Sequence, residues 1–473
     1  MKSLRTILPA LLLLMANQLF AQGKAVITGK ITNPLSDYVE LVTYSNPLIP
    51  EEKKIEVALN GNTFRIEVPV KDAVVAELLH DSEMVPVYLE PGYELNLSFN
   101  GDKFLKTLKF TGKGANENNY LANYTTRFED EEDYQVLPDN IKLKEGEFTE
   151  FLDYRLNDQQ KSLEKYTGKN PVSDKFKNYL QAEMEFSYAK DKLRYHQLRQ
   201  QVLQVELTKP SAAFYTYLDK LNFQRPANLM SAAFIDFLRG YAAHYAQEAG
   251  YTEKDAPYYK AAYDVAAQKL QGQAKQIAQA HILKQSIKSG HLKYTEQMLQ
   301  DFEATNQDAA VNDYLMALHS ANKSFAVGSE APDFTFRNLA GDTVSLSKYK
   351  GQLVYLSLWR SNCSLCMVEQ PHLEQLVDKF KGQNFVVLNV FVGEDEHKWR
   401  KAAQDKDLQA EQAFVSASQQ AALVEQYQLE DMPVYFLLDQ EGRLISQKAR
   451  HPNDREAASD IAKHLQTGQA SIQ

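Results

Sequence analysis

The sequence contains two cysteines, Cys363 and Cys366, and only two residues separate them. A thiolate attacks a disulfide, and the amino terminus of a helix favours the thiolate because its unpaired N–H groups carry about half a positive charge. An apolar run of strand length, Leu353–Trp359, precedes the pair, and an amphipathic stretch that reaches Phe380 follows it. We therefore predict a strand, the cysteine pair and a helix. In this arrangement Cys363 is the nucleophile, and Cys366 is the resolving thiol that closes a Cys363–Cys366 disulfide and releases a bound partner.

Two other interpretations of the cysteine pair are weaker. Two cysteines cannot form a disulfide framework or a four-cysteine metal site. Half of a zinc or copper site needs further ligands, and His372, directly after Pro371, is the only nearby candidate. Two buried, inert cysteines would have to fall at this spacing by chance. We therefore expect no metal and no cofactor.

The segments after the pair predict the rest of an α/β sheet. Phe385–Val392 is almost entirely apolar and predicts a central strand, and 395–403 and 419–427 predict helices. Met432 and Pro433 then open another apolar strand. A cis bond before a proline costs only about 0.5–1 kcal/mol, and it would turn the backbone of Met432 toward the cysteines. The alternative is a trans proline that opens an edge strand.

The amino-terminal segment, residues 1–21, has the three parts of a secretory signal. Lys2 and Arg5 form a basic start, an apolar run follows, and a short polar stretch ends near Ala21. A membrane anchor is the alternative, but the apolar run is shorter than the roughly 20 residues that cross a bilayer. No cysteine follows the run to accept a lipid. We expect a signal peptide that is cut after Ala21, and a soluble mature protein outside the cytoplasm.

The length of 473 residues predicts about three domains. Residues 24–113 alternate strands rich in Val, Ile, Leu and Tyr with Asn-Gly and Pro-Gly turns, which is typical of an antiparallel β-sandwich. Residues 114–322 have apolar side chains three and four positions apart, which indicates an all-α domain. Residues 323–473 hold the cysteine pair and alternate strands with helices, so we expect a carboxy-terminal α/β domain.

The composition excludes several classes of protein. Hydrophobic residues make up 44% of the chain and charged residues 24%, which disfavours a disordered or polytopic membrane protein. The formal net charge is −10 at pH 7. Because an acidic chain repels phosphate backbones, we expect no nucleic acid partner.

The last third of the chain, about 150 residues from Ala326, resembles the TlpA/ResA-like branch of the thioredoxin superfamily. Four motifs carry the resemblance: Gly328-x-x-Ala-Pro-Asp-Phe334, Trp359-x-Ser361-x-Cys363-x-x-Cys366, Glu369-x-Pro371 and Met432-Pro433. The layout of sandwich, helices and thioredoxin-like domain behind a signal sequence is similar to multidomain TlpA-like proteins of the Bacteroidetes type.

The resemblance implies a thioredoxin fold for residues 323–473 and a thiol-disulfide oxidoreductase activity, usually reducing. It implies a periplasmic enzyme whose substrates are oxidised proteins of the cell envelope and whose reductant is a membrane thiol donor. It also implies a functional Glu369, which we expect to take the proton of Cys366 during resolution. We expect Pro433 to take part in catalysis, and Met432 and Trp359 to contact the substrate.

The motif departs from the family pattern next to both cysteines. The family usually has Trp before the first cysteine and Pro before the second, whereas this chain has Asn362 and Leu365. Residues around the pair help to set its reduction potential, which spans about −270 to −120 mV among related folds. Oxidase or isomerase activity through the same cysteines therefore stays open, as does a binding or scaffold protein with a redox-inactive thioredoxin fold. Peroxide reduction is disfavoured because Arg360 stands where peroxiredoxins have Thr.

Overall fold

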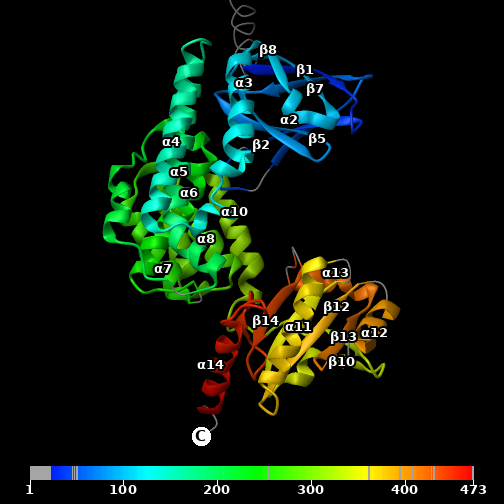
Figure 1. Ribbon diagram of the computed structural model, residues 1–473. Helices are drawn as coiled ribbons and strands as arrows, with labels where there is room; N and C mark the ends of the chain where they lie inside the picture. Colours follow the sequence, from blue (N-terminus) through cyan, green and yellow to red (C-terminus); the bar gives the residue numbers. More distant parts are fainter. Residues whose placement is uncertain are drawn as a thin grey trace, which may run out of the picture. The chain divides into compact units, whose positions relative to one another are not determined.

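The computed structural model describes most of the chain after the predicted signal peptide (Figure 1). The described residues are 23–44, 46, 48–49, 52–205, 207–253, 255–360, 363–393, 396–405, 409–427, 429 and 432–470. They form two compact units, the first running to Gly250 and including Asp264–Gln279, and the second made of Tyr251–Tyr263 and the chain from Ala280 onward. The predicted signal peptide, residues 1–21, lies outside the described residues.

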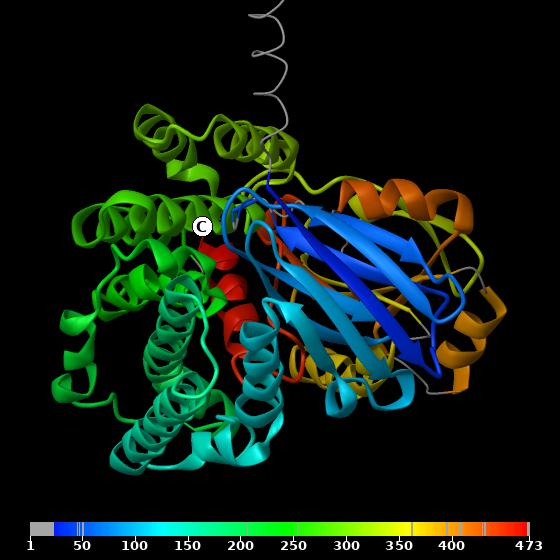
Figure 2. The same cartoon turned by 90° about the horizontal axis from the view of Figure 1, so that it is seen from above.

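Eight strands at the start of the first unit form two four-stranded sheets, drawn in blue in Figures 1 and 2. Buried and exposed residues alternate along these strands, as in sheets with one face against a core. One sheet has the order β4-β1-β7-β8, from strands Thr63–Pro69, Lys24–Thr32, Glu94–Asn100 and Lys109–Lys113. The other has the order β3-β2-β5-β6, from strands Glu52–Ala58, Tyr38–Tyr44, Val74–His80 and Glu83–Leu89.

The expectation of a purely antiparallel sandwich is wrong at one pair of strands. β1 and β7 are parallel neighbours, with Val26 opposite Glu94 and Thr32 opposite Asn100. Parallel neighbours need a long connection, and here the chain between them builds β2 to β6. The turn at Gly61 likewise joins β3 and β4, which belong to different sheets, and so does not close a regular hairpin.

Helices follow the sandwich, as the 3.6-residue pattern predicts. They are α3 Ala115–Tyr124, α4 Glu145–Thr167, α5 Asp174–Leu203, α6 Ala232–Glu248, α7 Ala256–Lys269, α8 Gly272–Lys288, α9 Thr295–Thr305 and α10 Ala309–Asn322, whereas the short α2 Phe104–Thr107 lies within the sandwich, between β7 and β8. Ser173 and Ser231 cap α5 and α6 by accepting the N–H groups of Phe176 and Phe234. One predicted helical segment, 214–221, forms 3₁₀ turns over Ala212–Lys220.

Helix α3 bonds to one edge strand of each sheet in the first unit. Asn118 is fully buried, and its side-chain amide accepts from the backbone N–H of Tyr88 at 2.8 Å and donates to the carbonyl of Tyr88 at 2.9 Å. Asn119 does the same at Phe110, at 3.0 and 2.9 Å. Tyr88 lies on β6 and Phe110 on β8, the last strands of their sheets. The sandwich and the first helices consequently share one hydrophobic core, in which Tyr88 packs edge-on against Phe176.

The second unit contains a seven-stranded sheet in the order β10-β9-β13-β12-β11-β14-β15. β11 Leu353–Trp359, β12 Phe385–Val392 and β13 Glu411–Val415 are parallel, and their neighbours in the sheet are antiparallel to them. The remaining strands are β9 Thr335–Asn338, β10 Thr343–Ser345, β14 Val434–Leu438 and β15 Leu444–Ser446. The helices are α11 Ser364–Lys379, α12 Glu396–Asp405, α13 Ala417–Gln426 and α14 Ala457–Ala470.

Apolar clusters cover both faces of this sheet. Leu373 of α11 and Ile461 of α14 belong to the cluster on one face, and Leu423 of α13 belongs to the cluster on the other. The two strands predicted from continuous apolar runs, β11 and β12, have the predicted bounds. Such runs are typical of parallel strands that are covered on both faces.

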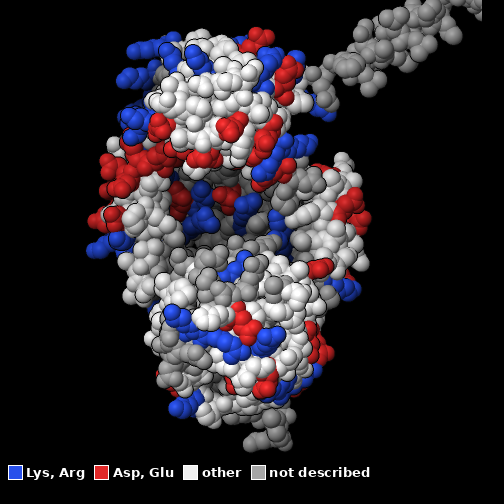
Figure 3. Space-filling model, turned by 90° about the vertical axis from the view of Figure 1, so that its right-hand side faces the viewer, with Lys and Arg blue, Asp and Glu red and all other residues white. Residues whose placement is uncertain are grey.

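The surface of the described chain carries both kinds of charge. Figure 3 shows Lys and Arg interspersed with Asp and Glu on one face. Among the described residues, no helix has the length and apolar character needed to traverse a lipid bilayer.

Candidate active site

The cysteine pair lies where β11 ends and α11 begins. Cys363 is the N-cap of α11, and its sulfur accepts the backbone N–H of Cys366 at 3.0 Å. The two sulfurs are joined in a disulfide, with the Cα atoms 5.2 Å apart. Cys363 is half-buried, whereas Cys366 is 1% exposed. The predicted strand, cysteine pair and helix are thus confirmed, and the accessible sulfur belongs to the predicted nucleophile, although the roles of the two thiols stay a prediction.

The segment before β14 lies against the first cysteine. The Met432–Pro433 peptide bond is cis, as predicted. The carbonyl oxygen of Met432 lies 3.4 Å from the sulfur of Cys363. The structure therefore brings Met432 and Pro433, about 70 residues along the chain, to the disulfide.

An aromatic cluster surrounds the second cysteine. Cys366 packs in one buried group with Trp359, Phe391, Trp399 and Phe414. The ring centroids of Trp359 and Phe391 are 4.9 Å apart. Trp359 is 3% exposed, so it lies beneath the site, and its predicted contact with substrate stays a prediction. Apolar surroundings of this kind disfavour the thiolate form of Cys366.

Glu369 lies one turn after Cys366 on α11 and is buried at 1% exposure. The hydroxyl of Tyr435 donates to its Oε2 atom, and Nδ1 of His451 lies 2.8 Å from its Oε1 atom. Burial, and then this hydrogen bond to Glu369, raise the pKa of Tyr435 far above its usual range. The structure therefore makes Glu369 the centre of a polar group inside an apolar core.

Tyr435 and His451 were not among the predicted site residues. Tyr435 lies in the predicted strand two positions after Pro433, and the alternation of a strand could have pointed to it. His451 lies 82 residues after Glu369 in a segment without a motif. No local signal in the sequence connects it to the site.

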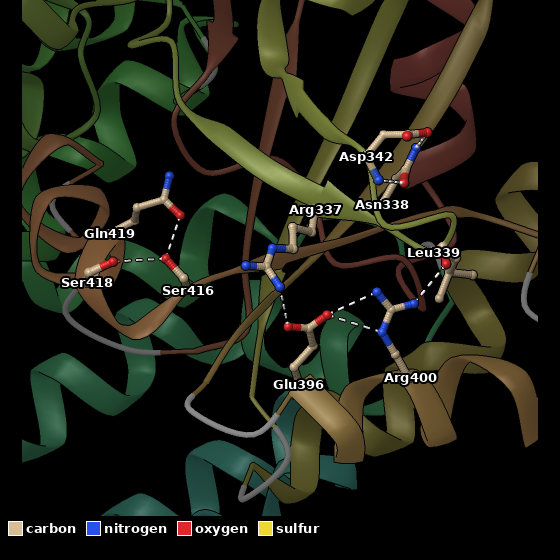
Figure 4. A network of polar contacts seen from close by, with 9 residues as sticks. All are labelled: Arg337, Asn338, Leu339, Asp342, Glu396, Arg400, Ser416, Ser418 and Gln419. Carbon is tan, nitrogen blue, oxygen red and sulfur yellow. Dashed lines mark hydrogen bonds and ion pairs between the residues drawn. The ribbon is translucent and has the colours of Figure 1, made fainter.

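A polar network fixes the start of α12, which follows β12 at the end of the sheet where β11 leads into the cysteine pair (Figure 4). Arg337 of β9 donates to Oε2 of Glu396 at 2.9 Å, and Arg400 donates twice to Oε1 at 2.9 and 3.1 Å. Arg400 also donates to the carbonyl of Leu339 at 2.8 Å. Trp399, the residue before Arg400 on α12, belongs to the aromatic cluster around Cys366.

Comparison with known protein families agrees with this geometry. The Redoxin family model matches residues 326–465. The thiol-disulfide oxidoreductase ResA of Geobacillus kaustophilus is 32% identical over 142 residues, which cover 30% of this chain and 78% of the relative. ResA of Bacillus cereus is 25% identical over 146 residues, which cover 31% of this chain and 82% of the relative.

The chain also matches a crystal structure of the thioredoxin domain of a thiol-disulfide oxidoreductase from Bacteroides vulgatus. It is 28% identical with a TM-score of 0.28, and the match covers 30% of this chain and 98% of that domain. The residues matched by the Redoxin model include the half-buried Cys363, the buried Cys366 and the cis proline. By its sequence relatives and by the thiol pair at the start of α11, the chain belongs to the TlpA/ResA-like thiol-disulfide oxidoreductases of the thioredoxin superfamily.

Proposed function

We propose that the protein is an exported disulfide reductase that acts on oxidised proteins of the cell envelope through Cys363 and Cys366. The observation that carries the proposal is the asymmetry of the pair, in which one cysteine is half-buried at a helix N-cap and the other is almost completely buried. Leu365 and Val368 are 48% and 61% exposed on the same helix. They give an unfolded or extended protein chain an apolar surface beside Cys363.

The proposed reaction transfers two electrons from the thiol pair to a substrate disulfide. The Cys363 thiolate attacks one substrate sulfur, so that a mixed disulfide forms and one substrate thiolate leaves. Cys366 then attacks the sulfur of Cys363, which restores the Cys363–Cys366 disulfide and releases the second substrate thiol. A membrane thiol donor supplies the two electrons that open the disulfide for the next cycle.

Glu369 is the base for the second step in this proposal. Its position one turn after Cys366, and its burial beside an apolar cluster, support the role that the family resemblance implies. A base is needed because Cys366 is buried and is a poor thiolate in these surroundings. Met432 supports substrate binding in the same proposal, because its carbonyl lies beside the reacting sulfur.

The periplasmic location rests on the amino-terminal segment alone. Its basic start, apolar run and Ala21 support export and removal of residues 1–21. Sequencing the amino terminus of the protein purified from the periplasmic fraction tests this part of the proposal. The expected first residue is Gln22, and an intact Met1 in the cytoplasmic fraction would contradict it.

The reduction potential of the Cys363–Cys366 pair tests the direction of electron flow. We expect a value near −270 mV, at the reducing end of related folds, from equilibration with a thiol buffer of known potential. Cys366→Ser is the control, because it cannot form the internal disulfide. A potential near −120 mV would identify an oxidant, and would favour the oxidase or isomerase that uses the same cysteines.

A further inference from the structure

We propose that His451 is the group through which Glu369 exchanges protons with solvent while Cys366 resolves the mixed disulfide. The inference rests on the proposed function of Glu369 as the base for Cys366. It makes His451 a positioning and proton-exchange residue that acts through Glu369 and does not touch the substrate.

Burial separates Glu369 from water. Its side chain is 2% exposed, and a base in such a place must pass on the proton that it accepts. Tyr435, one hydrogen-bond partner, is itself buried at 2% exposure. The other partner, His451, has a side chain that is 47% exposed. Of these two partners, His451 therefore connects the buried carboxyl group to solvent.

Two hydrogen bonds hold the backbone just before His451. The N–H of Ala449 donates to the carbonyl of Tyr435 at 2.8 Å, and the hydroxyl of Tyr355 donates to the carbonyl of Arg450 at 2.5 Å. The imidazole ring also packs edge-on against Tyr435, with 5.1 Å between ring centroids. These contacts aim Nδ1 at Glu369 and leave the rest of the ring toward solvent.

The other titratable groups nearby are unsuited to proton exchange at neutral pH. Burial, and then the nearby Glu369, raise the pKa values of Tyr435 and Tyr355, so both phenols stay protonated. Arg450 is always charged. Its guanidinium is bound by three carboxylates, from Asp454, Glu456 and Asp460. An imidazole is the side chain that gains and loses a proton between about pH 5 and 8.

The proposed path accounts for the protons in both halves of the cycle, in which the cysteine pair is first oxidised and then reduced. During resolution, Cys366 gives its proton to Glu369 while its sulfur bonds to Cys363, and the partner sulfur leaves with the electron pair of the broken bond. The ring starts in the tautomer that carries its proton on Nε2. Glu369 then passes its proton to the unprotonated Nδ1 of His451, Nε2 releases its proton to water, and the departing thiolate takes one from water. Reduction of the disulfide returns a proton to Cys366 by the reverse path, and the ring regains its starting tautomer.

Stopped-flow mixing of the reduced full-length protein with Ellman's reagent tests the proposal. Attack by Cys363 releases one coloured thiol in a first phase, and resolution by Cys366 releases a second. The variants are His451→Ala and His451→Asn. The Asn side chain can still hydrogen-bond Glu369 through its amide, but it cannot accept a proton on one atom and release one from another. His372→Asn is the matched control, because His372 lies on α11 but hydrogen-bonds Gln375.

We expect both His451 variants to slow the second phase about tenfold or more while the first phase stays within about twofold. In the wild type and in His372→Asn, the rate of the second phase should change with pH in one step, because the proposed path requires a proton to enter and leave an imidazole ring. The His451 variants should lose this step. Added imidazole should restore the second phase of His451→Ala.

Two results would overturn the role of His451. One is a His451→Asn variant whose second phase has the rate and the pH step of the wild type. This result would show that the ring acts only through its hydrogen bond to Glu369. The other is an equal loss in both phases, which would indicate a structural effect. Glu369→Gln separates this inference from the proposed function. If Glu369→Gln slows the second phase but the His451 variants do not, only the inference fails; if Glu369→Gln has no effect, both fail.

Discussion

The first compact unit and the carboxy-terminal α/β domain use buried and half-buried polar side chains for different purposes. In the first unit, Asn118 and Asn119 bond to backbone groups of strand edges, and Glu183 accepts the N–H of Ala233 at the start of α6. In the carboxy-terminal domain, Glu369 of α11 bonds to the side chains of Tyr435 and His451. Backbone partners hold elements in place. Side-chain partners that titrate can also move a proton. The first kind of contact therefore has a structural role, and the second kind can take part in a reaction.

The largest expected effect comes from the cysteines. Cys363→Ser should abolish disulfide exchange, because it removes the accessible sulfur at the N-cap of α11. Cys366→Ser should still attack a disulfide but should remain bound to it. Non-reducing electrophoresis after mixing with an oxidised protein checks this, and adducts that accumulate only in Cys363→Ser would reverse the assignment.

The next effect concerns the buried carboxyl group. Glu369→Gln should leave attack by Cys363 nearly intact and slow release by about a hundredfold, the usual range for loss of a general base. The variant keeps the size of the side chain and an oxygen that can accept from Tyr435. Rapid-quench measurement of the mixed disulfide checks the prediction, with the attack phase as its internal control. An unchanged release rate between about pH 6 and 9 would refute it.

A smaller effect is expected in the scaffold. Asn118→Ala leaves the buried N–H and C=O of Tyr88 without their partner, and it should lower the free energy of unfolding of the first unit by about 2–3 kcal/mol. Thiol exchange should not change, since no residue of the active site lies in that unit. Urea unfolding and the Ellman assay measure the two properties. Asn123→Ala, on the exposed face of α3, is the control and should leave both unchanged.

The smallest effect concerns Glu183. Burial raises its pKa above the ordinary value, so the folded unit binds its proton more readily than the unfolded chain does. The contribution of this group to stability therefore falls as the pH rises above about 4.5, the range in which the unfolded carboxyl loses its proton first. Glu183→Gln should be more stable than the wild type at pH 8 and nearly equal at pH 4.5. Urea unfolding at both pH values checks this, and an equal gain at both would contradict it.

Local sequence patterns predicted the parts of the site that depend on residues close together in the chain. Continuous apolar runs fixed β11 and β12, and the cysteine spacing placed Cys363 at the start of a helix. The parallel pairing of β1 with β7 and the contact of His451 with Glu369 were not predicted. Both join residues that are far apart in the chain, and the periodicity of a segment carries no information about which distant segment it meets.

Asn118 and Asn119 of α3 restrict where the sandwich can be separated from the rest of the chain. A sandwich excised after Lys113, at the predicted domain boundary, would lose Asn118 and Asn119 and would uncover the outer edges of β6 and β8 together. Open strand edges recruit strands from neighbouring molecules. Such a fragment would self-associate through these two edges, whereas one that retains α3 keeps β6 and β8 bonded to Asn118 and Asn119. The sandwich can therefore be recombined or transplanted only together with the helix that follows it.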